Sequence, residues 1–224
     1  MVKPKYFRPR LPIIDALRAH APREPFRVVG RDWVFLPNAS TQYGLEDVRG
    51  SDPMELASYA EFFRTFSVQE PGTDVKRVQD VDRPELDFLN VRFLLTEPDA
   101  QLGGKWRLLY RGADGTLFDN SQAERRFFSA TANIVSMTND DPRVFHVRVR
   151  AASASMILSS EPNAPGWRAT IDGRPAPIRP GTFISFAVPA GQHQASIQYR
   201  PRTFYLSLAA LAAGVLLVAL HGRR

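Results

Sequence analysis

The chain carries three close pairs of carboxylates, the residue type that glycoside hydrolysis uses as general acid and general base. The pairs are Asp80 with Asp82, Glu85 with Asp87, and Asp140 with Asp141. All three stand in polar stretches that contain Pro84 or Pro142, a setting that is typical of solvated loops. We therefore expect these carboxylates to lie in loops, and glycosidase turnover by the isolated domain would be needed to support a hydrolase.

Other catalytic and metal-binding patterns do not occur. The chain has four histidines, His20, His146, His193 and His221. None of them has the Glu-x-x-His or His-x-x-x-His spacing of metal sites. The sequence has no cysteine, no Gly-x-Ser-x-Gly elbow, no phosphate-binding glycine loop and no dinucleotide fingerprint. We expect no metal, no cofactor and no catalytic residue in this chain. His193 is predicted on the inner face of a strand, as a hydrogen-bonded core residue.

A polar loop from Asn38 to Asp52 is the first candidate binding surface. It contains Tyr43 and Arg49, and it runs into Ser51-Asp52-Pro53, which predicts the start of a helix. The N-terminus of a helix favours an anionic group. We therefore expect Asn38, Tyr43, Arg49 and Asp52 to contact a glycan or an acceptor. Alanine at Tyr43 and Arg49 should then weaken this contact without lowering the melting temperature.

Trp167 is the second candidate, because it follows a Pro165-Gly166 turn. An exposed tryptophan at such a turn would offer a rigid face on which a sugar or a lipid headgroup could stack. A tryptophan that opens a strand would instead fill the core of a sandwich. The second interpretation is favoured.

The charge pattern argues against nucleic acid as a partner. The net charge is +6, but the 29 basic residues are interrupted by 23 acidic ones, and no basic run exceeds two residues. No helix-turn-helix, zinc-finger or base-stacking motif accompanies the charge. A modestly basic surface suits anionic lipid headgroups equally well, so we expect a lipid bilayer and no nucleic acid.

The first half of the chain predicts mixed helix and strand. Apolar spacing predicts a helix over residues 13–20 and a second helix, with an aromatic stripe, that begins at Pro53. Short strands are predicted at 26–29 and 33–36, and a strand buried on both faces at 91–95. A hairpin should join 106–110 to 116–119 through a glycine-bearing loop.

The second half predicts a small antiparallel sandwich. Phe145, Val147 and Val149 alternate with polar residues, and the segment from His193 to Tyr199 does the same. Asp172-Gly173 is a strong hairpin signal, because both central positions of a type I′ turn need a positive φ.

The segment from Phe204 to Leu220 carries no charge and predicts a transmembrane helix. As a helix its seventeen residues would span roughly 26 Å, at the short end of what a bilayer requires. The alternative is a buried Ala/Leu helix of a soluble core, but only Ser207 and Tyr205 supply polarity here. Ala209 with Ala213, and Ala210 with Gly214, have the spacing that allows membrane helices to approach closely.

These elements together predict an α+β fold in five parts. They are a basic, proline-rich lead with a short helix at 1–22, a mixed α+β subdomain at 23–125, a β-sandwich at 126–200, a transmembrane helix at 204–220, and a basic tail at 221–224.

Several stretches in this order resemble the C-terminal part of YfhO-like bacterial membrane proteins, multi-pass proteins related to lipid-linked-sugar-dependent glycosyltransferases. The stretches are Phe26-Arg27-Val28-Val29, Leu36-Pro37-Asn38, Tyr43 to Pro53, Leu86 to Thr96, Pro165 to Ala169, Ile171-Asp172-Gly173, Val188 to Gly191, and Tyr199-Arg200-Pro201. They run from about residue 24 to the end of the chain.

This resemblance implies a domain outside the cytoplasm, tethered to the bacterial cell membrane by the last helix of a larger protein. Such proteins hold their proposed sugar-transfer chemistry in an N-terminal membrane bundle, and no bundle precedes Met1 here. We therefore expect a fragment, or a split protein that works with a multi-pass partner, and no catalytic residue can be assigned. The leading hypothesis is a non-catalytic accessory domain that contacts glycan or acceptor, and the alternative is a structural module that braces the bundle.

Overall fold

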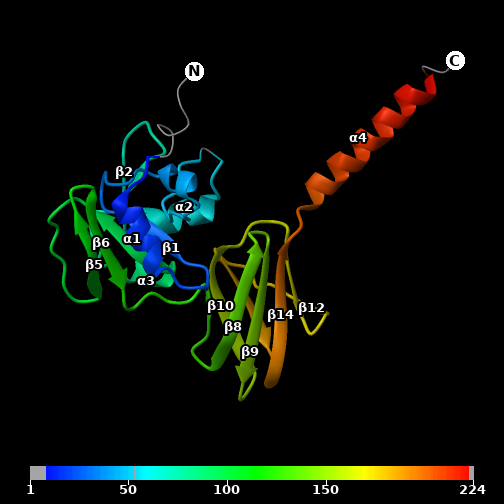
Figure 1. The fold of residues 1–224 in the computed structure, drawn as a ribbon. Coiled ribbons are helices and arrows are strands. Elements are labelled where there is room, and N and C mark those ends of the chain that lie inside the picture. Colours follow the sequence, from blue (N-terminus) through cyan, green and yellow to red (C-terminus); the bar gives the residue numbers. More distant parts are fainter. Residues whose placement is uncertain (1–8, 53, 222–224) are drawn as a thin grey trace.

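The computed structural model describes residues 9–52 and 54–221. Two bodies lie side by side, and a long helix projects away from them (Figure 1). The fold is mixed α and β with several sheets, and it is mostly β. The first body contains α1 (Pro12–His20), β1 (Arg27–Gly30), the 3-10 helix η2 (Ala39–Tyr43), α2 (Ala57–Arg64), β2 (Val68–Gln69), β3 (Lys76–Arg77), α3 (Pro84–Phe88), β4 (Val91–Thr96), β5 (Trp106–Gly112) and β6 (Gly115–Asn120).

A four-stranded sheet in the order β1-β4-β6-β5 forms the centre of the first body. Strands β1 and β4 are parallel, and the other neighbours are antiparallel. One face of the sheet packs on α1 through residues such as Phe93 and Leu95. The other face packs on α2 and α3 through residues such as Leu94. The predicted strand at 91–95 is therefore covered on both faces, as its continuous apolar run indicated.

Two local predictions in this body were wrong. Residues 33–36 form a turn instead of a strand, because Asp32 and Phe35 adopt positive φ angles of 51° and 50°. Helix α2 begins at Ala57, and its N-cap residue Leu56 makes no side-chain cap hydrogen bond. The Asp52 carboxylate instead accepts a hydrogen bond from the Met54 backbone N–H. Pro53, the predicted first helical residue, lies outside the described residues.

The second body consists of two antiparallel sheets around one apolar core. The sheet orders are β13-β10-β7 and β12-β11-β14-β9-β8. Asp172 and Gly173 join β11 to β12 with φ angles of 51° and 78°, as a type I′ turn requires. The strands are β7 (Phe127–Phe128), β8 (Ala132–Asp141), β9 (Val144–Ala151), β10 (Ser155–Pro162), β11 (Trp167–Ile171), β12 (Arg174–Ala176), β13 (Phe183–Val188) and β14 (Gly191–Tyr199).

Helix α4 (Arg202–His221) follows β14 and projects away from both bodies (Figure 1). Its large apolar side chains are exposed, including Phe204, Leu206, Leu211 and Val215. Within residues 9–52 and 54–221, however, no helix combines the length and the apolar character that a membrane crossing requires. The transmembrane helix expected at 204–220 is therefore not supported, although a helix does form there. Three of the four residues of the predicted basic tail, 222–224, lie outside the described part.

Candidate binding site at the junction of the two bodies

A buried network of charges joins the two bodies. The Arg27 guanidinium, on β1, donates to the Glu161 carboxylate at the end of β10 at 2.9 Å, and to the Ser160 carbonyl at 3.0 Å. The Arg126 guanidinium also binds Glu161, and it donates to Glu46 at 2.7 Å. Both arginine side chains are less than a tenth exposed, and that of Glu161 is 12% exposed. Glu161 and the half-exposed Glu46 therefore both pair with two buried cations that belong to different parts of the chain.

Charge pairing decides the protonation of Glu161. Burial raises the pKa of this carboxyl group, but the positive charges of Arg27 and Arg126 outweigh burial, and the pKa lies below its ordinary value. Glu161 is therefore ionised at neutral pH. Removing its charge would leave the two buried guanidinium groups with only the half-exposed Glu46 as an anionic partner, and loss of a buried partner is the costly case for a buried ion pair.

An aromatic contact adds apolar area to the same junction. Phe183, on β13, inserts its ring among Phe62 and Phe88 of the first body, with ring centroids 5.0 and 4.7 Å apart. Tyr59 lies against the same ring at 6.1 Å. All three contacts have the edge-to-face geometry that aromatic pairs favour. Charge pairing and apolar packing together fix one body against the other.

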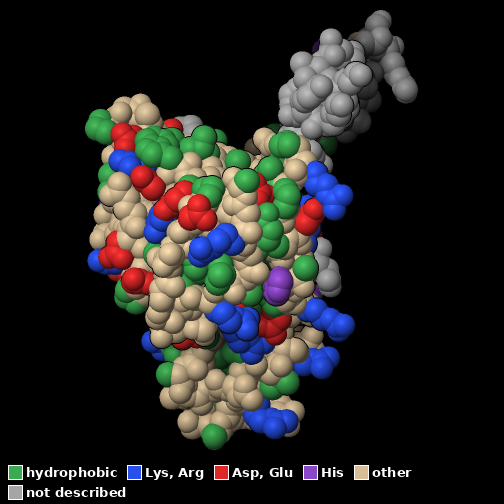
Figure 2. Space-filling view, turned by 60° about the vertical axis from the view of Figure 1, so that its left-hand side comes forward, with side chains coloured by type: hydrophobic (Ala, Val, Ile, Leu, Met, Phe, Trp, Pro, Cys, Tyr) green, Lys and Arg blue, Asp and Glu red, His purple; other side chains and the backbone are tan. Residues whose placement is uncertain are grey.

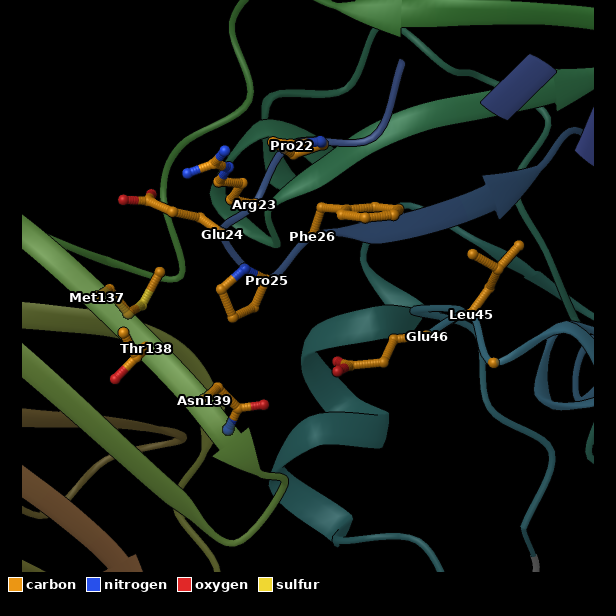
Figure 3. A pocket seen from close by; sticks show the side chains of 11 residues that line it. Pro22, Arg23, Glu24, Pro25, Phe26, Leu45, Glu46, Met137, Thr138 and Asn139 are labelled. Atoms are coloured by element: carbon orange, nitrogen blue, oxygen red, sulfur yellow. The ribbon is translucent and has the colours of Figure 1, made fainter. Parts of the chain in front are cut away.

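A cavity of about 320 Å³ opens at this junction. One wall is the segment from Pro22 to Phe26, a second is Gly44 to Glu46, and the third is Met137 to Asn139 of β8. Figure 3 shows the Glu46 carboxylate and the Asn139 amide pointing toward one another across the gap. The exposed lining of the cavity is more polar than apolar, and its volume lies at the lower end of the range of small-ligand sites.

The cavity walls are held by contacts outside the cavity. Glu46 accepts from Arg126, so its position depends on the buried network. Glu24 pairs with Arg125, whose guanidinium also donates to the Ile134 carbonyl of β8. Since both carboxylates are anchored by arginines of the connecting segment, the cavity keeps its shape without a ligand.

The part of the chain that forms the sandwich is similar to a known protein family. Residues 122–210 match a family model described as Bacterial membrane protein YfhO. This match supports membership of the YfhO-like family for this part of the chain. The matched part contains Arg126, Glu161, all of β7 to β14 and the start of α4. No curated protein and no solved structure matches the chain.

The match covers the sandwich and the start of α4, and it leaves residues 1–121 without a match. The cavity is bounded by both the matched and the unmatched part of the chain. Met137 to Asn139 fall inside the matched residues, while Pro22 to Phe26 and Gly44 to Glu46 come from the part before them. The candidate site is therefore a feature of the complete two-body arrangement.

Arg49 was wrongly expected on the surface of the candidate loop. Its side chain is fully buried and pairs with Asp47, and it donates to the carbonyls of Asp32, Val34 and Phe35. These are the carbonyls of the turn at 32–35, so Arg49 holds that turn in place. A guanidinium with all of its donors satisfied inside the protein cannot bind a glycan.

The other residues of the predicted loop site lie apart from the cavity lining. Asn38 is exposed and exchanges hydrogen bonds with the Ser51 backbone. Tyr43 is half-buried, and its hydroxyl donates to the Pro9 carbonyl. Asp52 is exposed but precedes no helix directly. The neighbouring residues Gly44, Leu45 and Glu46 do line the cavity, so the expected region is adjacent to the site.

Trp167 does not line the cavity, because it lies on β11, three strands away from β8 in the same sheet. Its ring packs 5.3 Å from that of Tyr199 and 6.1 Å from that of Phe145, at the edge of the core. The favoured interpretation of a core-packing tryptophan agrees with this position. The ring stays half-exposed.

The carboxylate pairs serve structural contacts in the described part of the chain. Asp87 accepts from Lys105 at 2.7 Å and from the Asn120 amide at 2.6 Å, and Asp82 accepts from the Trp106 indole at 3.0 Å. Asp141 pairs with Arg143. The expectation of solvated loops was wrong for two pairs, because Glu85 and Asp87 lie in α3 and residues 140–141 end β8, and Asp87 is only 15% exposed. No group of three or more Asp, Glu or His among residues 9–52 and 54–221 is arranged to hold a metal.

His193 is hydrogen-bonded, as expected. Its Nδ1 lies 2.7 Å from the Asp172 carboxylate and its Nε2 lies 3.1 Å from the Ala190 carbonyl. The side chain is 15% exposed. These contacts join the start of β14 to the β11–β12 turn.

The residues that make the junction were not found from the sequence. Glu46, Arg126 and Glu161 come from positions far apart in the chain, and no short motif links them. The signal that was available is a charged residue at the end of an apolar strand, as Glu161 is in β10. A buried charge needs a partner, but the sequence does not say which one.

Proposed function

We propose that this chain is a non-catalytic accessory domain of a YfhO-like membrane glycosyltransferase system, and that the cavity at the junction contacts the glycan or acceptor. Family membership supports a role at the membrane. The cavity supports a binding role, because it presents Glu46, Thr138 and Asn139 beside the apolar surfaces of Phe26 and Met137. Carboxylate and amide groups next to an aromatic face are typical of sugar recognition.

We propose that α4 attaches this domain to the membrane. The observation that supports it is the exposure of apolar side chains such as Leu208, Leu211 and Val215 on a helix that projects from the body. An exposed apolar surface of this kind is unfavourable in water and favourable in lipid. Protease protection of the two ends of α4 in sealed vesicles would distinguish a helix that crosses the bilayer from one that enters it only in part.

The binding role is tested by closing the cavity. Thr138 is an exposed residue of β8 that lines it, so Thr138→Arg should fill the cavity without disturbing the core. Asn133→Arg is the matched control, since Asn133 is exposed on the same strand at the opposite end. The measurement is binding of labelled bacterial envelope polysaccharides to the full chain in detergent. Loss of binding in the first variant alone supports the proposal, and equal binding in all three proteins rejects it.

A structural role is the second candidate, and the observation that favours it is the rigid junction. Arg27, Arg126 and Glu161 lock the bodies together with Phe183, as a brace between a membrane helix and a distant partner would require. This role predicts that a multi-pass membrane protein co-purifies with the tagged chain from bacterial membranes. It also predicts that no polysaccharide binds. Removal of α4 should abolish the co-purification while leaving the two bodies folded.

A further inference from the structure

Three arginines surround the point where α4 leaves the sandwich. Arg168 lies on β11, and Arg200 and Arg202 lie on either side of Pro201 at the step from β14 to α4. All three are exposed. Because Arg168 pairs with Gln198, two residues before Arg200, strand pairing brings the three together at one end of the sheet. We call Arg168, Arg200 and Arg202 the arginine collar.

The arginine collar has no carboxylate partner in the described part of the chain, whereas the nearby Arg143 is paired with Asp141. Three adjoining hollows of about 410, 680 and 360 Å³ are lined by collar residues. None of the residues that line these hollows is acidic. The collar is therefore an uncompensated positive surface with room for a ligand.

The backbone holds the collar in place. The Arg200 N–H donates to the Gly166 carbonyl at 2.8 Å. A Cβ on Gly166 would meet the Pro201 Cα at 2.9 Å, so only glycine permits this close approach. Trp167 packs on Tyr199 beneath the collar, and Tyr205 lines the first hollow with Arg200 and Arg202. Positive charge and aromatic rings thus stand together at the base of the exposed apolar helix.

We infer that the arginine collar binds the anionic headgroups of phospholipids in the leaflet that α4 enters. A guanidinium matches a phosphate with two parallel hydrogen bonds. Tryptophan and tyrosine are enriched at the depth of the headgroups. The start of α4 adds the positive end of a helix dipole. This inference rests on the proposed membrane attachment of α4, whose apolar side chains begin at Phe204, two residues beyond the collar.

The test is flotation of the full chain with two kinds of vesicle, phosphatidylcholine alone and an equimolar mixture with phosphatidylglycerol. The test variant is Arg168→Gln with Arg200→Gln and Arg202→Gln. Each basic residue near an anionic surface contributes roughly fivefold in partition. The triple variant should therefore lose on the order of 100-fold in partition to anionic vesicles, and its binding to neutral vesicles should not change.

The control is a variant with the same charge change elsewhere, Arg148→Gln with Arg150→Gln and Arg174→Gln. All three control residues are exposed, and Arg150 lies opposite Gln192. At about 3.3 Å per residue, this position is roughly 26 Å along β14 from Arg200. The control should bind both vesicles as the parent does. A loss equal to that of the collar variant would mean that net charge alone drives binding, and it would overturn the inference.

The outcomes separate the inference from the proposed attachment. If the parent chain bound neutral and anionic vesicles equally, the inference that the collar binds anionic headgroups would be overturned. The proposed attachment by α4 would still stand. If the parent chain bound only anionic vesicles, and the collar variant lost this binding, the result would support headgroup binding by the collar. It would count against insertion of α4 into the bilayer. Inorganic phosphate, added at constant ionic strength, should not compete, and complete competition would show that the collar recognises free phosphate instead of lipid.

Discussion

The Glu161 carboxylate lies 2.9 Å from Nη2 of Arg27, and this contact joins the sandwich to the first strand of the other body. Glu161 also binds Arg126, so a single buried group holds two cations. The two bodies are consequently coupled by electrostatics that water does not screen well.

Replacing Glu161 by Gln should destabilise the chain by about 3–5 kcal/mol, because it removes the buried carboxylate from Arg27 and Arg126 and leaves them only the half-exposed Glu46. The measurement is the free energy of unfolding in urea. Glu97→Gln is the control, since Glu97 pairs with Arg31 but is 49% exposed, and a surface pair contributes about 0–1 kcal/mol. Equal effects of the two substitutions would show that the junction does not depend on this charge.

Phe183→Ala should loosen the junction, because it removes the ring that packs on Phe62 and Phe88. We expect a loss of about 2–3 kcal/mol, since Phe183 is only partly buried. Phe183→Leu should recover part of it. Denaturant unfolding measures the loss, and limited proteolysis of the segment that joins the bodies measures their separation. Phe204→Ala is the control, because Phe204 is exposed on α4, and a comparable loss there would refute the packing role.

Arg49→Ala should lower the melting temperature, contrary to the expectation from the sequence. The guanidinium satisfies the carbonyls of Asp32, Val34 and Phe35 and neutralises the buried Asp47, so its removal should cost about 3–5 kcal/mol. Arg49→Lys should recover only part of this, because lysine lacks the planar fork. The control is Arg150→Ala. A melting temperature that Arg49→Ala leaves unchanged would show that the turn at 32–35 is stable without the Arg49 side chain.

The contact between His193 and Asp172 should make the β11–β12 turn sensitive to pH. The hydrogen bond to Asp172, followed by that to the Ala190 carbonyl, raises the pKa of His193 above its ordinary 6.5. The hydrogen bond from the Gln194 N–H, followed by that to His193, lowers the pKa of Asp172 below 3.8. The contact between His193 and Asp172 therefore makes its full contribution to the stability of the fold between about pH 4 and 6.5.

This contribution should fade as pH rises through the raised pKa of His193, and as pH falls through the lowered pKa of Asp172. The measurement is the NMR titration of His193 together with melting temperatures across this range. Asp172→Asn should return the His193 pKa toward its ordinary value and flatten the pH dependence of stability between pH 6 and 8. A His193 titration that Asp172→Asn leaves unchanged would contradict this account.

The charged surface agrees with the sequence in one respect. Acidic and basic side chains are interspersed on the face that Figure 2 shows, with hydrophobic ones between them. This face carries no extended patch of one sign of the kind that a nucleic-acid surface would need. The absence of a nucleic-acid partner stays a prediction, as do the glycan and the multi-pass partner.

Local patterns in the sequence predicted the elements whose conformation depends on neighbouring residues. The spacing of Ile13, Ile14 and Leu17 predicted α1, the alternation of Phe145, Val147 and Val149 predicted β9, and Asp172-Gly173 predicted its turn. In each case a period of 3.6 or 2, or a required positive φ, is written in consecutive residues. These features are determined by the chain before any long-range contact forms.

Tertiary structure alone decided where the charged side chains go. Arg49 looked like a surface residue of a polar loop, yet it is buried because the turn at 32–35 offers it three carbonyls. Arg27, Arg126 and Glu161 meet only when the two bodies pack together. A charge can be buried wherever a partner compensates for lost hydration. Since that partner can come from any part of the chain, no local pattern reveals it.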